Sequence, residues 1–384
     1  MIPLSVPSIQ GNEWKYIKEC LDTGWVSSIG RYVDLFEEKI KEYTGVKYAI
    51  SCVNGTSALH IALQLAGVRP GDEVIVPTLT FIAPVNVVRY LNANPVFMDA
   101  DEFFNIDVEK TINFIHKCTK YKSGYTINKL TNKRIAAIIP VHVFGNAVDI
   151  EPFLDICHDR NIKIVEDATE SLGTRYISGN IEGKHAGTIG TLGCLSFNGN
   201  KMITTGGGGM ILTDDPGLAK KAKYLTTQAK DDGVKYIHNE VGYNSRLTNI
   251  QAGMGVAQLE QLSKFLEAKK HVFLIYKEKI NLTPGLHVAN VPGYADNNHW
   301  MIPTQINKNI YGKDRDELMA DMLQNDIEVR PIWHLNHLQK PYEHCQSYKI
   351  EKAEDLLAKT LSIPSSVNIS EDQVNFVIKS LSNA

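Results

Sequence analysis

The chain lacks the features that mark secreted, zinc-binding and membrane proteins. Its six cysteines lie far apart and form no C-x-x-C pair, which argues against a disulfide framework and against a zinc site. The N-terminus has no basic segment followed by an apolar one, and no apolar run approaches the ~20 residues needed to span a bilayer. We therefore expect reduced, mostly buried thiols, no metal, no membrane partner and a cytoplasmic protein.

An excess of charge of one sign is also missing. The 40 basic and 43 acidic residues are interspersed and give a formal net charge of -3, so nothing indicates binding to nucleic acid or to an anionic membrane. A length of 384 residues, 43% of them hydrophobic, is enough for one large core and a second, smaller one. The expectation is a two-domain protein with a small ligand.

From about Thr56, helical patterns alternate with short β-branched runs, which predicts an α/β fold with a mainly parallel sheet covered on both faces. The predicted strands are residues 73–76, 95–98, 135–141, 162–165, 192–197 and 209–213. The last two flank a loop that contains Lys201. Since ligands of such sheets bind at strand ends, we expect the site there.

The C-terminal third predicts a separate, smaller unit. A long helical pattern over residues 248–280 is expected to lead out of the large domain, and residues 299–306, 314–325 and 372–381 predict an α+β domain. We place the large domain at residues 1–255 and the small one at 256–384. The polar stretch 121–134 is typical of an exposed insertion before the strand at Ile135, with a plain loop as the alternative.

Three motifs are informative only in combination. An apolar strand ends in Glu166-Asp167, although a single acid at a strand end is more often a helix cap. Asn54-Gly55-Thr56-Ser57 precede a helical pattern, where they can bind an anion or simply cap the helix. Lys201 precedes four glycines without the G-K-[ST] of a phosphate loop, and a single loop lysine is usually solvated.

Together the motifs offer a phosphate cradle, an acid to hold a ring nitrogen and a lysine able to form a Schiff base. Those are the requirements of pyridoxal 5′-phosphate (PLP).

The order of the motifs resembles the sugar aminotransferase family of DegT/DnrJ/StrS type. The similar segments are N-G-T-S, then E-D-A, then S-F-x-x-x-K-x-x-x-T-G-G-G-G, then G-Y-N-S-R-L at 242–247 and Gln251-Ala252, over nearly the whole chain. The resemblance implies a type I PLP aminotransferase fold, PLP as cofactor and a homodimer with shared active sites. It also implies that L-glutamate donates the amino group to a nucleotide-linked keto-sugar.

The resemblance assigns catalytic roles to three residues. Lys201 would carry the cofactor and move the proton, and Asp167 would pair with the protonated pyridine nitrogen, a bond that depresses the pKa of the carboxylate. Glu170 is a departure, because many relatives carry His or Gln beside the 3-hydroxyl of the cofactor. Glu is found at this position in members similar to GDP-perosamine synthases and to the 4-aminotransferases of legionaminic acid and bacillosamine pathways. The residue therefore favours amination at carbon 4 of the sugar over carbon 3.

Cofactor contacts are implied at six further positions. Thr56, Ser57 and Ser196 would hold the phosphate, and Gly55 would let the backbone approach it. The ring of Phe81 would stack on the cofactor, with core packing as the alternative. Asn244 would reach the phosphate in the partner subunit, with a local loop cap as the alternative.

Six residues are candidates for contact with the sugar nucleotide: Trp25, Ser27, His142, Lys184, Arg330 and His337. A structural role explains His142 equally well, and Lys184 is explained better as a solvated charge.

The expected substrate is a 4-keto-6-deoxy sugar linked to UDP or GDP, with an acetamido group favoured at carbon 2. The alternatives are a 3-aminotransferase acting on a 3-keto sugar, a PLP-dependent sugar dehydratase and a non-catalytic regulatory protein of the same fold. A dehydratase carries His at the catalytic position, so Lys201 argues against it. A regulatory protein would not need the residues that hold the cofactor, and the chain keeps Asp167, Lys201 and the phosphate cradle.

Overall fold

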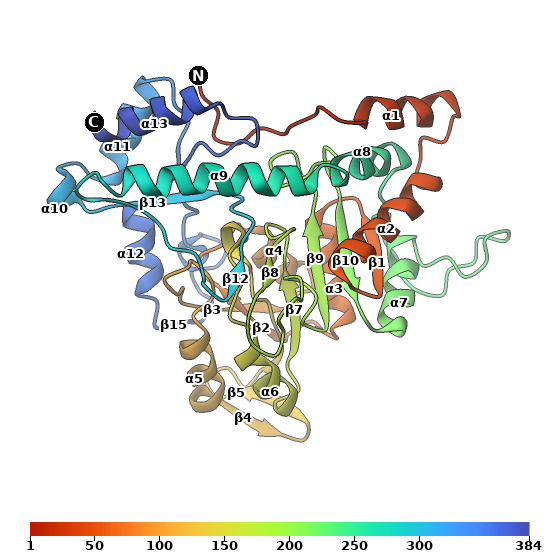
Figure 1. Ribbon diagram of the computed structural model, residues 1–384. Coiled ribbons are helices and arrows are strands. Elements are labelled where there is room, and N and C mark those ends of the chain that lie inside the picture. The colour runs from red at the N-terminus through yellow and green to blue at the C-terminus, as the bar shows by residue number, and fades with distance from the viewer. Residues whose placement is uncertain (384) are drawn as a thin grey trace.

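The central feature of the molecule is a ten-stranded mixed sheet, seen in a computed structural model that describes residues 1–383 (Figure 1). Its main path runs β1 (Tyr48–Cys52), β10 (Gly209–Thr213), β9 (Leu192–Ser196), β7 (Lys163–Asp167), β6 (Arg134–Ile138), β2 (Glu73–Pro77), β3 (Asn94–Met98) and β15 (Ser347–Tyr348). All neighbours from β9 to β15 are parallel, whereas β10 is antiparallel to both β1 and β9. The carboxyl ends of the parallel strands therefore share one edge.

Helices cover both faces of this sheet. They are α2 (Arg31–Thr44), α3 (Gly55–Leu65), α4 (Ala83–Tyr90), α5 (Val108–Cys118), α6 (Glu151–Asp159), α7 (Pro216–Thr226) and α8 (Asn249–Leu259), with a 3₁₀ turn η1 (Val143–Gly145). A further helix, α1 (Glu13–Asp22), packs on α8. Strand side chains alternate between faces. Val74 and Val76 of β2 accordingly pack in one buried cluster with α2 and α3, while Ile75 packs in another with Phe114 and Phe153. Burial on both sides explains why these strands are continuous apolar runs.

A second, four-stranded sheet with its own hydrophobic core forms from the C-terminal part of the chain. Its order is β11 (Leu286–Val288), β13 (Ile302–Ile306), β16 (Thr360–Ile363) and β14 (Arg330–Pro331), with α9 (Leu262–Ile280), α10 (Lys308–Tyr311), α11 (Arg315–Gln324), η2 (Asn336–Leu338), α12 (Lys352–Lys359) and α13 (Glu371–Asn383). A two-stranded ribbon joins β8 (Arg175–Tyr176) to β12 (Ala295–Asp296). The N-terminus also reaches this region, where Ile2 pairs with Ile327.

The predicted α/β class and the six predicted strands are confirmed, with small differences at their ends. The stretch 121–134 is largely exposed, as expected for an insertion, but the alternative of a loop without strands is wrong. This stretch forms a hairpin of β4 (Thr119–Lys122) and β5 (Tyr125–Asn128), and β5 extends the sheet beside β6. Its inward side chains are polar but satisfied: Thr126 donates to the carbonyl of Arg160, and the Asn128 amide donates to Glu73 (2.7 Å). A pattern search for apolar residues misses such a strand.

The single helix predicted over 248–280 is also wrong, because α8 ends at Leu259 and α9 begins at Leu262. The turn is held by α1. The carboxylate of Glu260 accepts hydrogen bonds from Asn12 (2.7 Å) and Tyr16 (2.6 Å). The apolar period continues through the break, so periodicity alone does not reveal it. The domain division at 255/256 falls inside α8 and stays a prediction.

All six cysteines are free; Cys118 and Cys345 are partly exposed and the other four are buried. Within residues 1–383, no helix combines the length and the apolar character needed to cross a membrane.

Candidate active site

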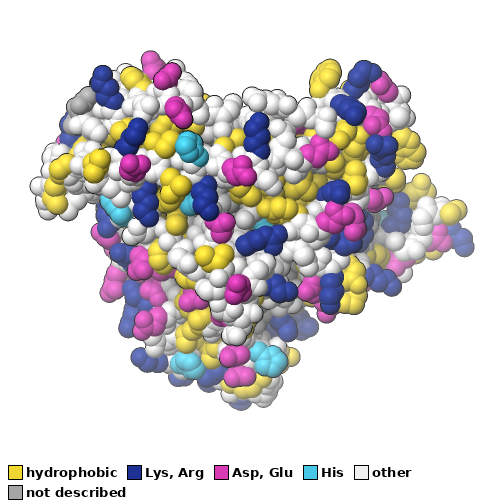
Figure 2. Space-filling view, in the orientation of Figure 1, with side chains coloured by type: hydrophobic (Ala, Val, Ile, Leu, Met, Phe, Trp, Pro, Cys, Tyr) yellow, Lys and Arg dark blue, Asp and Glu magenta, His cyan; other side chains and the backbone are white. Residues whose placement is uncertain are grey.

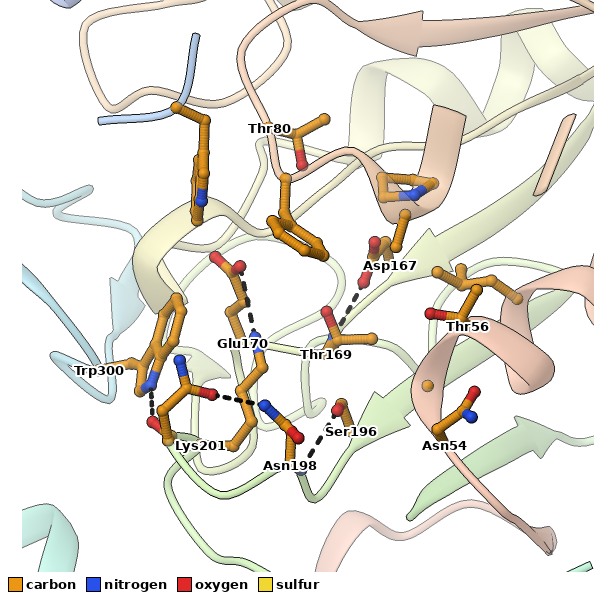
Figure 3. A pocket seen from close by; sticks show the side chains of 17 residues that line it. Asn54, Thr56, Thr80, Asp167, Thr169, Glu170, Ser196, Asn198, Lys201 and Trp300 are labelled. Carbon is orange, nitrogen blue, oxygen red and sulfur yellow. Dashed lines mark hydrogen bonds and ion pairs between the residues drawn. The ribbon is translucent and has the colours of Figure 1, made fainter. Parts of the chain in front are cut away.

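A pocket of about 410 Å³ lies where β7 and β9 end. It is lined by the start of α3, the loop before α4, the loops after β7 and β9, and two tryptophans from the C-terminal part of the chain. Figure 3 shows Asp167, Glu170 and Lys201 converging on the same space from these loops. The strand-end position matches the expectation for an α/β sheet.

One end of the pocket is the N-terminus of α3. The side chain of Asn54 caps this helix by accepting from the Ser57 backbone N–H (2.7 Å), which leaves the positive end of the helix dipole directed at the pocket. Thr56 and Ser196 line the same end. Gly55 is packed so closely that an added Cβ would lie 2.9 Å from the Cβ of Ser196. The arrangement suits a phosphate group.

A buried carboxylate lies deeper in the pocket. Asp167 is the last residue of β7 and only 2% exposed, and its Oδ1 accepts a hydrogen bond from the Thr169 N–H (3.1 Å). Burial raises the pKa of Asp167, while the hydrogen bonds of Thr169 and the charge of Lys201 act in the opposite direction. A cationic ring nitrogen placed beside it would lower that pKa and stabilise the ion pair.

The amine of Lys201 faces a second buried acid. Its Nζ lies 3.4 Å from Oε1 of Glu170 and 4.0 Å from the ring centroid of Trp300. The other carboxylate oxygen of Glu170 accepts from the Phe144 N–H (2.8 Å). Burial raises the pKa of Glu170, and the positive charge of Lys201 opposes that shift. The Glu170 carboxyl group therefore lies within reach of a proton donor or acceptor placed in the pocket.

The single chain brings together seven of the predicted cofactor and catalytic residues: Gly55, Thr56, Phe81, Asp167, Glu170, Ser196 and Lys201. Phe81 lines the pocket and is 52% exposed, and its ring centroid lies 6.5 Å from that of Trp333. Core packing, the alternative role, does not explain so exposed a ring. Ser57 does not line the pocket. Asn244 is exposed, in an isolated bridge with Thr227 outside the pocket.

None of the six candidates for the sugar nucleotide lines this pocket. His142 is fully buried; its Nε2 is 3.0 Å from Glu166 and its Nδ1 accepts from the Val148 N–H, which favours the structural alternative. Lys184 is exposed, and Arg330 pairs with Glu328 on the surface.

The other three candidates are held elsewhere in the fold. His337 contacts the Thr78 hydroxyl (2.7 Å). Trp25 and Ser27 are exposed between α1 and α2, and their carbonyls accept from Asn249.

Sequence reasoning missed four residues that line the pocket beside the lysine: Asn198, Asn200, Trp300 and Trp333. The asparagines occupy variable positions of the S-F-x-x-x-K motif, so proximity to the lysine could have indicated them. The two tryptophans lie 99 and 132 residues after Lys201 in the chain, and only the tertiary fold places them here.

The described residues fit PLP on structural grounds: a helix N-terminus with two hydroxyls for the phosphate, a buried acid for the ring nitrogen and a lysine amine that lines the same pocket. The fold and the site together define a type I PLP-dependent aminotransferase.

Known proteins agree with this class. The family model of the DegT/DnrJ/EryC1/StrS aminotransferases matches residues 7–382. A GDP-perosamine synthase of Caulobacter vibrioides is 38% identical over 385 residues, covering 99% of this chain and 97% of that protein. A putative pyridoxal phosphate-dependent aminotransferase of Bacillus subtilis, EpsN, is 35% identical, covering 99% and 95%. The chain belongs to the DegT/DnrJ/EryC1/StrS aminotransferase family.

A solved structure from Brucella abortus, described as a DegT DnrJ EryC1 StrS aminotransferase, has the same fold. Its TM-score is 0.86 at 28% identity, covering 96% of this chain and 94% of that one.

Proposed function

We propose that this enzyme transfers the amino group of L-glutamate to carbon 4 of a 4-keto-6-deoxy sugar linked to a nucleoside diphosphate. Lys201 carries the proposal, since it faces Asp167, Glu170 and the phosphate cradle in one pocket. GDP-perosamine synthases are among the relatives, and perosamine is a 4-amino sugar, which supports carbon 4 and favours GDP over UDP. A product assay with both kinds of sugar decides whether carbon 2 carries a hydroxyl or an acetamido group.

The residues of the chain divide the work. When bound, PLP supplies a ring that draws electrons from the carbon next to the transferred nitrogen. Asp167 would keep the ring nitrogen protonated, a role that requires a carboxylate and not an amide. Lys201 is the amine that would hold the cofactor and would move a proton to or from the reacting carbon. Glu170 lies 3.4 Å from the Lys201 amine and holds it in position as a hydrogen-bond partner.

The product assay tests this assignment. The purified protein is incubated with PLP, L-glutamate and each of four 4-keto-6-deoxy sugars: GDP- or UDP-linked, with or without a 2-acetamido group. We expect an amino sugar from the GDP-linked substrate and the nitrogen at carbon 4 by NMR, with Lys201→Ala inactive. A fifth incubation contains a nucleotide-linked 3-keto sugar, and nitrogen at carbon 3 from that substrate alone would instead establish the 3-aminotransferase. No amino sugar from any substrate would remove the proposed activity and leave the regulatory alternative.

We also propose that the protein is a homodimer whose sites are shared. Among the described residues that line the pocket, Lys201 is the only basic one, against Asp167 and Glu170. A cofactor phosphate and a nucleoside diphosphate add several negative charges, which the partner subunit would have to balance.

An apolar surface supports the same proposal. In Figure 2, hydrophobic side chains gather around α1, α2 and α8, and Trp14 (76% exposed) and Ile29 (66% exposed) belong to this region. Such a patch is suited to subunit contact.

Complementation tests the sharing. Asn244, exposed outside its own pocket, would reach the phosphate of the partner's cofactor. The Lys201→Ala and Asn244→Ala proteins should each be nearly inactive alone. After random exchange of subunits about half of the dimers are mixed, and one of the two sites in each mixed dimer is intact. The mixture should therefore regain about a quarter of wild-type activity. No recovery despite demonstrated exchange would mean that Asn244 does not serve the partner's site.

A further inference from the structure

The indole of Trp300 forms one wall of the space occupied by the Lys201 amine. The Lys201 Nζ lies 4.0 Å from the centroid of the ring, within the range of a cation–π contact, and 3.4 Å from Oε1 of Glu170. Trp300 is 2% exposed, and the side chain of Lys201 is 14% exposed. The ammonium group therefore has two largely buried partners, and burial strengthens such contacts.

Every polar group of Trp300 has a partner. Its indole Nε1 donates to the carbonyl of Asn200 (2.6 Å), next to Lys201 in the chain, and its backbone N–H donates to Oδ1 of Asn298 (2.9 Å). Its carbonyl accepts from Nζ of Lys269 (2.8 Å) and from the Ser365 hydroxyl (3.3 Å). The ring is thus fixed both to the lysine loop and to α9.

The presence of Lys269 at this carbonyl is unusual. It is 2% exposed in the middle of α9, and lysine is rarely buried without a charged partner. In the part of the chain that the structure describes, its Nζ contacts only the Trp300 carbonyl and the Ser365 hydroxyl. The buried Lys269 amine therefore fixes the backbone carbonyl of Trp300, the residue that carries the indole.

The same segment holds Glu170. The side-chain amide of Asn298 donates to the carbonyls of Glu170 (2.8 Å) and Leu172 (2.9 Å). Between Asn298 and Trp300, His299 has a positive φ of 52° and stacks on Phe273 with ring centroids 4.2 Å apart. A non-glycine residue keeps such a conformation only where its surroundings enforce it. Residues 298–300 therefore position both partners of the Lys201 amine.

We propose that Trp300 is a positioning residue that holds the free ammonium group of Lys201 against Glu170 through the face of its indole. An amine that is released from a cofactor must remain within reach of the reacting carbon, and a lysine has a flexible four-carbon stem. The indole and Glu170 restrict it to one place. This inference rests on the proposed function only in that Lys201 is the reacting amine.

Fluorinated tryptophan tests the contact without changing the shape of the site. Replacement of tryptophan by its mono-, di- and trifluorinated analogues lowers the negative potential on the face of the ring in steps. The cation–π attraction for the ammonium group of Lys201 weakens accordingly. The readout is the rate at which acetic anhydride acetylates Lys201 at one fixed pH, measured by mass spectrometry relative to the exposed Lys184. The full chain is used without cofactor and again with pyridoxamine 5′-phosphate bound. We expect the rate to rise with each fluorine, by roughly 2- to 30-fold overall.

Two backgrounds identify the ring responsible, since the chain has four tryptophans. The trend should vanish in Trp300→Phe, which keeps the other three, and persist in Trp333→Phe, which removes another tryptophan of the same pocket. A flat response, or a trend unchanged in Trp300→Phe, would overturn the proposal. If Trp300→Phe does not fold, loss of the trend in Trp333→Phe would overturn it equally, because Trp333 would then be the ring responsible. Acetylation needs no sugar, so a failed substrate assay leaves this result independent.

Discussion

Adding one methyl group at Gly55 should weaken PLP binding by a predictable amount. In Gly55→Ala the new Cβ would lie 2.9 Å from the Ser196 Cβ and 3.1 Å from Cγ2 of Thr169. The threonine methyl can turn away, but the Ser196 Cβ is attached directly to the backbone of β9 and cannot. Because the backbone of Gly55 is not in the left-handed region, the effect comes from crowding and not from strain.

The magnitude follows from the cost of overpacking, about 1–3 kcal/mol. If Ser196 and the helix N-terminus move apart to admit the methyl, the phosphate cradle is distorted and the Kd for PLP rises roughly 5- to 150-fold. The assay is a titration of cofactor-free protein with PLP, followed by absorbance, with a thermal melt of the same sample to separate lost affinity from lost stability.

Gly199→Ala is the matched control. Gly199 lies between two residues that line the same pocket, and an added Cβ there would meet nothing within 4 Å. Its Kd should match that of the wild type. A Gly55→Ala protein that binds PLP within twofold of the wild type would refute the reasoning about the cradle.

Three further changes have defined outcomes. Asp167→Asn should reduce kcat for amino transfer at least about 100-fold, because an amide cannot hold the ring nitrogen protonated; near-normal turnover would mean that another acid does so. Glu170→Gln should flatten the pH dependence of the visible spectrum of the PLP-bound protein, and an unchanged pH profile would place Glu170 away from the cofactor. Burial lowers the pKa of Lys269 to about 7, from its ordinary value of 10.5. Between these two pH values the unfolded chain therefore binds more protons than the folded chain. Relative to Lys269→Met, the unfolding free energy of the wild type should therefore rise with pH, by up to about 1.4 kcal/mol per unit, and parallel urea curves at pH 7, 8 and 9 would contradict this.

The sequence predicted the strands and the pocket residues that lie next to them, because both follow from local patterns. Asp167 ends an apolar run and Lys201 lies between two strands, so their placement at one edge follows from the sheet. Gly55 begins a helical run after β1, and it reaches the same edge because β1 and β9 both pair with β10 in the antiparallel sense.

Features that depend on contacts between distant segments were not predicted. The hairpin at β4 and β5 is stabilised by polar bonds such as that between Asn128 and Glu73, which no hydrophobic period reveals. Trp300 meets Lys201 only because Lys269 and Asn298 hold its backbone. Asn244, Lys184 and the residues of the N-terminal loop lie outside the pocket of a single chain, so their roles stay predictions.

The short strand β15 has a consequence for how the chain can be divided. It comes from the C-terminal part of the chain, yet it pairs in parallel with β3 through Ser347 and Tyr348 and closes that edge of the large sheet. A fragment ending at residue 255 would expose the buried strand Val96-Phe97-Met98 as an open edge, ready to pair with other chains. We expect such a fragment to aggregate. In the growing chain the same edge stays open until residues 347–348 have been made and can pair with β3. The nascent enzyme is therefore most exposed to misassembly after its catalytic lysine has already been made.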